Sequence, residues 1–395
     1  MDASDVERAR GLTPGCAHVL HLNHAGASLL PQPVLDAMVD HLGLEARIGG
    51  YEAAEVAAPQ LERTYAAVAE LIGADTSEIA LMDSASRAWD MAVYSLPIEP
   101  QDRVIISRSE YGSNAIALLQ LKQRTGCQLV LVDDDQHGQI DLEALERELA
   151  EGDTALVSLV HVPTQGGLVN PAVEVGRLCR EAGVLFVLDA CQSAGQLPLD
   201  VNELGCAVLT GNGRKFLRGP RGTGFLYMRR DLIPLIEPAM LDLHAATWTA
   251  PDRYEVRDDA RRFETWESDV AARIGLGVAV DHALGWGIDA IAERNSMLAD
   301  GLRRRLADIP GVTLHDKGAQ RCAITTFTVA GVEPEDVKGR LREKRVNVNV
   351  VTASSAQLDL PHRGLADLVR ASLHYVTTED ELDRFADLIN RICVR

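Results

Sequence analysis

The chain lacks long apolar runs and lacks an excess of basic residues. None of its apolar segments reaches the ~18 residues of a membrane span, and its first residues, Met-Asp-Ala-Ser-Asp-Val-Glu, include no apolar segment of signal-peptide length. Its 39 basic residues stand against 58 acidic ones, a net charge of -19, which disfavours binding to nucleic acid and to anionic membrane surfaces. We therefore expect a soluble, cytoplasmic protein with no nucleic-acid partner and no membrane partner.

Paired cysteine motifs are missing as well. The number of cysteines, seven, is odd and no two of them form a CxxC pair, so the sequence suggests neither a disulfide framework nor a zinc site. We expect most of them to be reduced and buried, where they pack as small hydrophobic side chains, and we expect no bound metal. The cysteines are Cys16, Cys127, Cys179, Cys191, Cys206, Cys322 and Cys393.

Apolar strand-like segments alternate with amphipathic helical stretches over the first two thirds of the chain. Such strands, apolar throughout and separated by helices, predict a mostly parallel sheet covered on both faces. Ligands of these sheets lie at the carboxyl ends of the strands. The predicted strands are 103–107, 129–132, 155–162, 184–188, 207–210 and 224–228, with a helix at 172–182 between two of them.

The pattern changes near residue 267, and a chain of 395 residues exceeds what one core usually covers. We predict an N-terminal segment (1–20), a large domain (21–265) and a smaller α+β domain (266–395). The small domain is expected to contain helices at 271–307 and 334–344, strands at 323–329, 346–351 and 369–376, and a closing helix from residue 378. The irregular stretch 240–262 is either a flap over the pocket or a surface excursion.

Two residues carry the clearest chemical signal. Lys215 lies in the glycine-rich segment 210–224, and Asp189 ends the apolar run Val-Leu-Phe-Val-Leu-Asp, 26 positions earlier. An amine held among glycines can bind an aldehyde as an imine, and a buried anion can keep a ring nitrogen protonated. Because both residues follow strand ends, they predict a site for an aldehyde cofactor.

These segments resemble the pyridoxal-phosphate (PLP) enzymes of aminotransferase class V, which include cysteine desulfurases, isopenicillin-N-epimerase-like proteins and the carbon–sulfur lyase of ergothioneine biosynthesis. The resemblance covers nearly the whole chain. It implies an α/β protein of PLP-dependent transferase fold type I, with a large, mostly parallel sheet domain and a smaller α+β C-terminal domain. It also implies pyridoxal 5'-phosphate bound to Lys215, an amino-acid-derived substrate with an α-carboxylate, and a homodimer.

The resemblance further implies a set of cofactor contacts. Asp189-Ala-Cys-Gln192-Ser-Ala-Gly195 matches the family's Asp-x-x-Gln-x-x-Gly element, in which Asp189 pairs with the pyridine nitrogen and Gln192 with the ring oxygen. Segment 84–87 precedes a predicted helix at 88–96 and is expected to hold the phosphate. Cys191 is interpreted as a spacer facing the core. The cofactor-binding residues implied are Ser84, Ala85, Ser86, Arg87, Tyr111, Thr164, Asp189, Gln192, Asn212, Arg214 and Lys215.

Several of these positions depart from the pattern of relatives. Tyr111 stands where desulfurases carry a histidine stacked on the ring, so catalytic proton transfer is expected to rest on Lys215. Thr164 stands where relatives often have Asn, and Asn212 and Arg214 stand where many have Ser or His. His161 is interpreted as a packed histidine at a strand end.

The substrate side is implied in the same way. Arg370 matches the C-terminal Arg-x-Ser motif and is expected to hold the α-carboxylate through two hydrogen bonds. His24 and Ala25 lie in a segment resembling the strand whose backbone approaches that carboxylate. Segment 262–268 aligns with one that reaches the partner subunit's phosphate, with Thr265 or Ser268 as the candidate hydroxyl.

One family feature is missing. Desulfurases carry a nucleophilic cysteine on a loop before the Arg-x-Ser motif, and the corresponding loop 351–364 holds none. We therefore expect imine formation, loss of the Cα proton and β-elimination from a cysteine S-conjugate without a persulfide cysteine. Alternatives are a class V aminotransferase of a biosynthetic pathway, an isopenicillin-N-epimerase-like epimerase and a catalytically silent cofactor-binding regulator.

Overall fold

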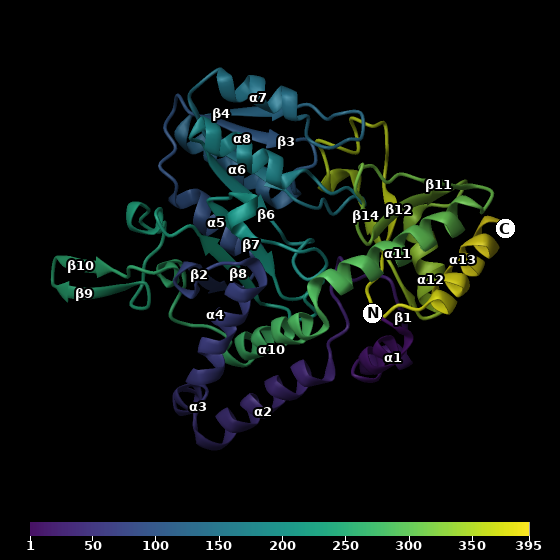
Figure 1. Cartoon of the computed structure of the whole chain (residues 1–395), viewed down its shortest axis with the longest axis horizontal. Helices are drawn as coiled ribbons and strands as arrows, with labels where there is room; N and C mark the ends of the chain where they lie inside the picture. Colours follow the sequence, from purple (N-terminus) through teal and green to yellow (C-terminus); the bar gives the residue numbers. More distant parts are fainter. Residues whose placement is uncertain (395) are drawn as a thin grey trace.

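The computed structural model describes residues 1–394, and a seven-stranded sheet forms the centre of its larger part (Figure 1). Strands β3 to β7 run parallel, whereas β8 is antiparallel to both of its neighbours. The predicted strands are thus present and the sheet is mostly parallel, as expected. The order across the sheet is β2 (Ile79–Met82), β8 (Gly224–Met228), β7 (Val208–Asn212), β6 (Leu185–Asp189), β5 (Thr154–Val160), β3 (Arg103–Ser107) and β4 (Gln128–Val132).

Helices cover both faces of this sheet because its strands are apolar on both sides. Helices α5 (Ala85–Ser95) and α6 (Gly112–Thr125) pack on the face that includes Val104 and Val187. On the other face lie α4 (Ala58–Ile72), α7 (Leu142–Ala150), α8 (Ala172–Ala182) and the short α9 (Val201–Leu204). The carboxyl ends of the parallel strands are left free to carry a site.

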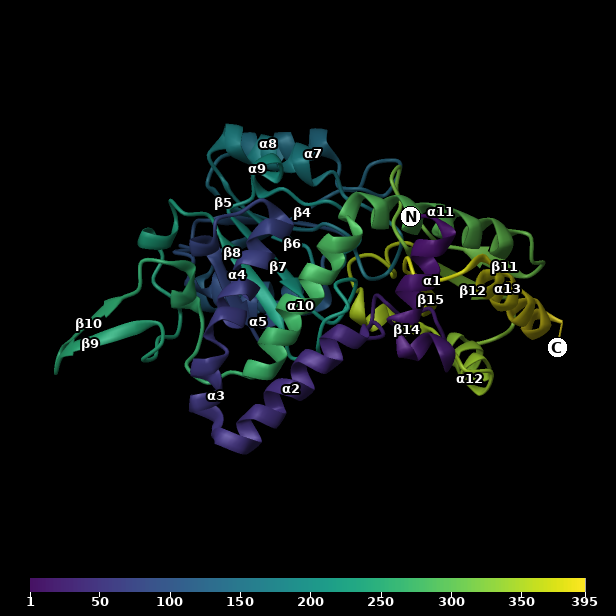
Figure 2. The same cartoon turned by 60° about the horizontal axis from the view of Figure 1, so that its bottom comes forward.

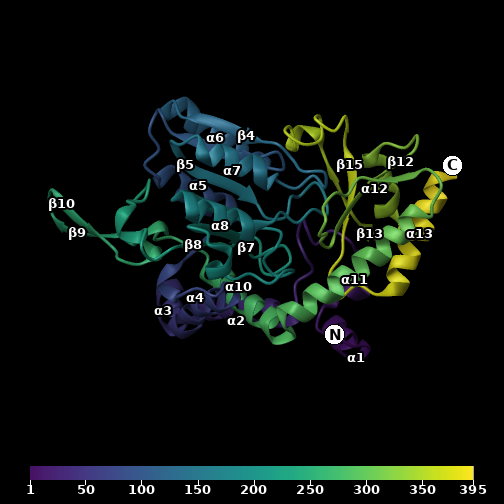
Figure 3. The same cartoon turned by 45° about the horizontal axis from the view of Figure 1, so that its top comes forward.

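The smaller part is built on an antiparallel four-stranded sheet, beside which the large sheet lies in Figure 3. Its helices bury apolar side chains against that sheet in a second core. The sheet order is β11 (Val312–Leu314), β12 (Ile324–Val329), β15 (Leu368–Ser372) and β14 (Asn349–Val351), and the helices are α11 (Ile288–Ala307), α12 (Pro334–Glu343) and α13 (Glu379–Cys393).

The packing departs from the predicted domain bounds at two places. After α1 (Ala3–Gly11), strand β1 (Leu20–His21) pairs with β13 (Val346–Asn347), and the segment from Leu20 to Ala25 contributes to the small core rather than to the large one. Helix α10 (Val270–Trp286) packs on α2 (Gln32–Ile48) and α4, so its buried side chains belong to the large core.

The helical stretch predicted at 271–307 is two helices, because the chain turns at Gly287, whose φ of +82° favours glycine. Among residues 1–394, no single helix is long and apolar enough to cross a membrane. The pair α10 and α11 passes that test together but is bent by 77°, and the two helices bury their apolar sides in the cores described above.

The stretch 240–262 contains a hairpin of β9 (Ala246–Ala250) and β10 (Arg253–Val256) that projects from the body (Figures 1 and 2). Trp248 and Tyr254 on it are exposed. Helix α2 and the short α3 (Gly50–Val56) form the lower edge of Figure 2. The hairpin stands away from the body of its own chain, and its interpretation as a flap over the pocket stays a prediction.

Candidate active site

The sheet brings Asp189 and Lys215 to one edge. Asp189 is the last residue of β6, and Lys215 follows the end of β7, the next strand in the sheet. Because parallel neighbours end at the same edge, both side chains belong to the carboxyl end of the sheet. Asp189 is 4 % exposed and Lys215 is 8 % exposed, so both functional groups are buried.

The carboxylate of Asp189 is held on both oxygens. Its Oδ1 accepts a hydrogen bond from the backbone N–H of Cys191 (2.9 Å), and its Oδ2 accepts one from Nδ2 of Asn114 (3.0 Å). Two donors on one buried carboxylate fix its orientation. The arrangement suits an anion that faces a protonated ring nitrogen.

The amine of Lys215 lies among groups that act on its charge. Burial lowers the pKa of Lys215, Asp189 and Cys191 oppose that shift, and the guanidinium groups of Arg214 and Arg370 add to it. Its Nζ is 6.0 Å from the ring centroid of Tyr111, the residue that precedes α6. A lysine with a lowered pKa loses its proton more easily, as imine formation requires.

Thr164 joins two predicted site residues. Arg370 donates from Nη1 to the backbone oxygen of Thr164 (3.2 Å) and also to its hydroxyl, while Gln192 donates from Nε2 to the same hydroxyl (3.2 Å). Gln192 also donates to the backbone oxygen of Ala25 (3.1 Å). Burial, with a smaller contribution from Arg214, lowers the pKa of Arg370 to about 10. The residues predicted for the ring oxygen and the substrate carboxylate thus form one cluster.

Segment 84–87 starts α5 three residues earlier than the helix was predicted to begin. The hydroxyl of Ser84 caps this helix by accepting from the backbone N–H of Arg87 (3.2 Å). Ala85 is buried. A Cβ atom added to Gly224 would lie 2.6 Å from the carbonyl carbon of Ser84, so only a glycine at position 224 lets β8 come this close to the turn. Ser86 follows in the first turn, and the amide groups there suit an anion.

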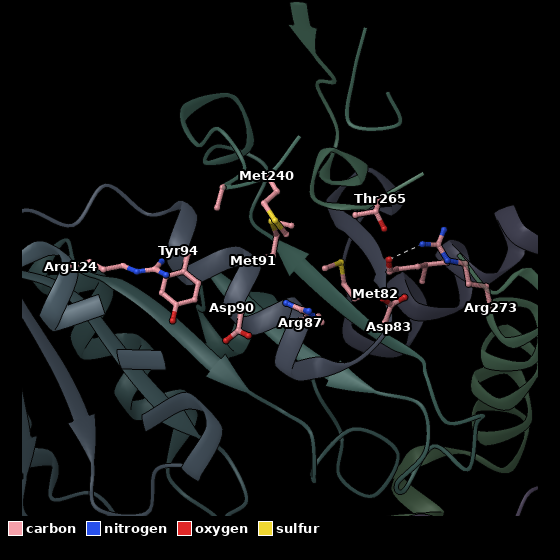
Figure 4. Close-up of a pocket in the computed structure, with 12 residues that line it drawn as sticks. Met82, Asp83, Arg87, Asp90, Met91, Tyr94, Arg124, Met240, Thr265 and Arg273 are labelled. Carbon is pink, nitrogen blue, oxygen red and sulfur yellow. Dashed lines mark hydrogen bonds between the residues drawn. The ribbon is translucent and has the colours of Figure 1, made fainter. Parts of the chain in front are cut away.

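The side chain of Arg87 lines a cavity. This cavity has a volume of about 420 Å³, and Asp83, Asp90 and Thr265 also line it (Figure 4). Lys215 does not line this cavity. Ser84, Ala85 and Ser86 thus lie at the start of α5, and the phosphate contacts predicted for them and for Arg87 stay predictions.

Arg214 and Asn212 come from the strand and loop that lead to Lys215. The guanidinium of Arg214 donates to the backbone oxygen of Gly26, and its own backbone oxygen accepts from the N–H of Ser28 (2.8 Å). Its predicted phosphate contact stays a prediction. Asn212 ends β7 with its side chain buried.

The N-terminal segment reaches the site through its backbone. The backbone N–H of Ala25 donates to the hydroxyl of Ser372 (2.9 Å). The ring of His24 packs edge-on against those of His21 and His374, with centroids 4.7 Å and 5.2 Å away, and burial holds the pKa of His24 well below its usual range. The side chain of His24 is thus part of a buried histidine cluster.

His161 is buried at the end of β5, as predicted. Its backbone N–H donates to the backbone oxygen of Asp189 (3.0 Å), and burial lowers the pKa of His161 to about 4. Cys191 is buried too, and burial raises the pKa of its thiol. A protonated thiol in this position is a weak nucleophile.

Buried polar atoms without a hydrogen-bond partner within residues 1–394 include Oε1 of Gln192, Oδ1 of Asn212 and Nε of Arg370. All three residues lie in segments that already contact Asp189, Lys215 or Thr164. Because unsatisfied buried polar atoms are costly, they indicate a site for a polar ligand, and the residues fit pyridoxal phosphate. Among the same residues, no group of three or more His, Cys, Asp or Glu side chains is placed to hold a metal.

Sequence reasoning missed two residues that organise the site. Glu110 is a buried carboxylate directly before Tyr111, and a charged residue in a loop gives no signal of burial. Arg218 is 1 % exposed and bonds to Leu29, Tyr375 and Thr13, tying the lysine loop to both ends of the chain.

A buried lysine and a buried carboxylate at the carboxyl end of a mostly parallel sheet, with a second α+β domain beside it, define a PLP-dependent enzyme of fold type I. The model of the family Aminotransferase class-V matches residues 20–385. The chain belongs to this family, which confirms the predicted class of enzyme, its fold and its cofactor.

Three similar proteins illustrate the match. A probable hercynylcysteine sulfoxide lyase of Mycobacterium tuberculosis is 32% identical over 386 residues, covering 97% of this chain and 92% of the relative. A probable cysteine desulfurase of Methanothermobacter thermautotrophicus is 28% identical over 382 residues, covering 94% of each. The solved apo structure of a cysteine desulfurase from Thermococcus onnurineus NA1 has a TM-score of 0.92 at 24% identity and covers 98% of both chains.

Proposed function

We propose that this enzyme cleaves the carbon–sulfur bond of a cysteine S-conjugate by β-elimination and forms no persulfide on the protein. One observation carries the proposal: the catalytic residues are assembled beside a loop that contains no cysteine. The loop 351–364 follows β14, the strand next to Arg370. The backbone oxygen of Ser355 would lie 2.8 Å from a Cβ atom added to Gly112, so the loop packs beside Tyr111.

Each residue has a defined task in this reaction. The two-nitrogen fork of Arg370 holds the α-carboxylate of the substrate. The neutral amine of Lys215 takes the proton from Cα, and the Cβ–S bond then breaks with its electron pair leaving on sulfur. Pyridoxal phosphate supplies, when bound, a ring that withdraws the electron pair left at Cα, and Asp189 keeps the ring nitrogen charged. The three-carbon fragment is hydrolysed to pyruvate and ammonia.

Sulfur leaves on the substrate's own fragment in this scheme. The nearest cysteine in sequence to Asp189 is Cys191, whose thiol is buried and has a raised pKa, so it is a poor acceptor of sulfur. The loop hydroxyls of Ser354 and Ser355 cannot replace a thiolate in that role. The relative from Mycobacterium tuberculosis, named as a lyase of a cysteine-derived sulfoxide, supports the same class of substrate.

We also propose that the enzyme is a cytoplasmic homodimer in which Thr265 or Ser268 reaches the partner's phosphate site. Large exposed apolar side chains support a partner surface on α2, α3 and the region of the hairpin. The seven cysteines are free within the described chain, which fits a reducing compartment. The exposed apolar residues are Leu35, Val39, Leu42, Ile48, Tyr51, Val56, Leu243, Trp248, Tyr254 and Trp266.

The reaction is tested by incubating the PLP-loaded enzyme with cysteine S-conjugates, including a sulfoxide, and measuring pyruvate and ammonia. Stoichiometric pyruvate, ammonia and sulfur-containing fragment are expected, with Lys215→Ala as the inactive control. Formation of pyridoxamine phosphate and a 2-oxo acid that keeps its sulfur would instead identify an aminotransferase. Loss of chirality at Cα without cleavage would identify an epimerase.

A further inference from the structure

A second carboxylate lies behind Asp189. Glu110 occupies the turn between β3 and α6 and is 3 % exposed. Its Oε1 accepts from the backbone N–H of Tyr111 (2.8 Å), and its Oε2 accepts from the hydroxyl of Ser158 on β5 (2.9 Å). A carboxylate in such a position must be bonded on every side to remain charged.

One amide group joins this carboxylate to Asp189. Nδ2 of Asn114, in the first turn of α6, donates to Oε1 of Glu110 (3.0 Å) and to Oδ2 of Asp189 (3.0 Å). An amide nitrogen carries two hydrogens, so each carboxylate receives one of them. Asn114 is itself 2 % exposed, and direct hydrogen bonds link the three side chains.

This chain also places two negative groups on the same side of the site. Burial raises the pKa of Glu110 to about 7, its three hydrogen bonds oppose the shift, and the charge of Asp189 adds to it. Such proximity costs free energy in the protein alone, and a cation beside Asp189 would offset that cost. The protonated ring nitrogen of the cofactor is a cation of this kind.

We propose that Glu110 and Asn114 are positioning residues that hold the carboxylate of Asp189 against the ring nitrogen of pyridoxal phosphate. Asn114 fixes one oxygen of Asp189, and Glu110 fixes the amide of Asn114 so that it cannot rotate away. The inference depends on the cofactor assignment but not on the fate of the substrate after Cα deprotonation.

A structural role for Glu110 predicts something different. Through its bond to the N–H of Tyr111, Glu110 could merely shape the turn that carries the tyrosine ring. Loss of that function would weaken binding of any planar ring at Lys215. Loss of the proposed function would weaken binding only of a ring that contains the nitrogen.

The experiment uses two cofactors and the full-length apoprotein. Dissociation constants are measured for pyridoxal phosphate and for its 1-deaza analogue, in which carbon replaces the ring nitrogen. Glu110→Gln keeps the size of the side chain and removes its charge. We expect this variant to raise the dissociation constant of pyridoxal phosphate about tenfold, the equivalent of about one pKa unit of lost charge interaction. The dissociation constant of the analogue should rise less than about twofold.

Asn114→Leu removes the amide group that donates to both carboxylates. We expect it to weaken the binding of pyridoxal phosphate and of the analogue to the same extents as Glu110→Gln does. Because Glu110 acts through Asn114, the double variant should bind pyridoxal phosphate no more weakly than Asn114→Leu alone. Ser109→Ala is the matched control, since its hydroxyl lies in the same turn but bonds to Ser107 and Asn170 instead. It should leave both constants unchanged.

Equal weakening of both cofactors by Glu110→Gln would overturn the proposal in favour of a structural turn. An unchanged affinity for pyridoxal phosphate, or additive losses in the double variant, would overturn it as well. A wild-type chain that binds neither compound would overturn the cofactor assignment and this inference together. Tight binding without β-elimination would overturn the proposed function alone.

Discussion

The two sides of the site are built differently. Behind the cofactor position, all four carboxylate oxygens of Asp189 and Glu110 accept hydrogen bonds. On the other side, Gln192 and Arg370, the residues predicted for the ring oxygen and the substrate carboxylate, each keep a buried polar atom that has no partner within the described residues. We call the side formed by Asp189 and Glu110 the floor; its hydrogen bonds are complete, so it holds one ligand group in one orientation. We call the side formed by Gln192 and Arg370 the mouth; it obtains its missing hydrogen-bond partners from the ligand that binds.

The difference indicates where the family's chemistry is retained and where it changes. The floor contains the lysine and the carboxylate that any class V enzyme needs, and a second carboxylate supports them. The mouth contains Tyr111 and Thr164, which depart from the pattern that the resemblance implies, and the loop 351–364 beside them has no cysteine. Variants of the floor should therefore affect every reaction of the cofactor, and variants of the mouth should affect substrate choice.

The largest effect is expected at the centre of the site. Lys215→Ala removes both the imine-forming amine and the base for Cα, so turnover should fall by at least about 10³-fold. The visible absorption of the purified protein should be lost at the same time. Both are measured on the same preparation, and a variant that keeps colour and activity would contradict the assignment of Lys215.

The position of the loop that carries Lys215 also depends on Arg218, whose guanidinium bonds this loop to both ends of the chain. Arg218→Met leaves the hydroxyls of Tyr375 and Thr13 and the backbone oxygen of Leu29 without their donor, and we expect a loss of about 2–4 kcal/mol in stability. Thermal unfolding of the apoprotein measures this loss. The exposed Arg221→Met in the same loop is the control, and equal melting temperatures for the two variants would show that the buried bonds contribute nothing.

How much of this could be predicted from the sequence differs between the two sides. Asp189 and Lys215 were predictable because strand ends and glycines mark them locally. Glu110, Asn114 and Arg218 were not, because their roles arise from contacts with residues far away in the sequence and no local pattern reports such contacts. The fold follows the same rule.

The strands and helices of the sheet were predictable from their apolar runs, since a strand buried on both faces must be apolar. The placement of α10 in the large core was not, because a helix that is apolar on several sides can pack on either domain. The pairing of β1 with β13 joins segments more than three hundred positions apart, and such short strands carry no period to read.

The ionisation of Glu110 makes the stability of the folded chain depend on pH. The pKa of Glu110 is about 7 in the folded chain and 4.5 is its ordinary value, so the folded state binds more protons than the unfolded state between these pH values. This contribution to stability is present below the ordinary pKa and is lost as pH rises through the folded pKa. The Glu110→Gln variant lacks this pH-dependent contribution to stability because glutamine does not titrate.

We therefore expect the stability of apo Glu110→Gln, relative to that of the wild type, to increase between about pH 5 and about pH 8. Parallel melting curves over this range measure the difference, and other titrating groups cancel because both proteins carry them. A relative stability that is constant with pH, or that falls, would contradict the raised pKa of Glu110.

The mouth is probed by Arg370→Lys. A lysine cannot form the two-nitrogen fork, so KM should rise about 10- to 100-fold while kcat changes less, because the lost contact is to the carboxylate and not to the reacting bond. Steady-state kinetics with a cysteine S-conjugate separate the two constants. A fall confined to kcat would place Arg370 in the chemical step instead of in substrate binding.

The smallest effect is expected for Cys191→Ala, and it separates the two chemistries of the family. Its backbone N–H, the group that bonds to Asp189, is kept, and replacing a buried thiol by a slightly smaller apolar group should change β-elimination by less than about threefold. If Cys191 accepted sulfur, its loss would abolish turnover, and mass spectrometry of the wild type during turnover would detect the added sulfur atom. Near-normal pyruvate formation by this variant would show that Cys191 accepts no sulfur, and the loop 351–364 holds no other cysteine that could do so.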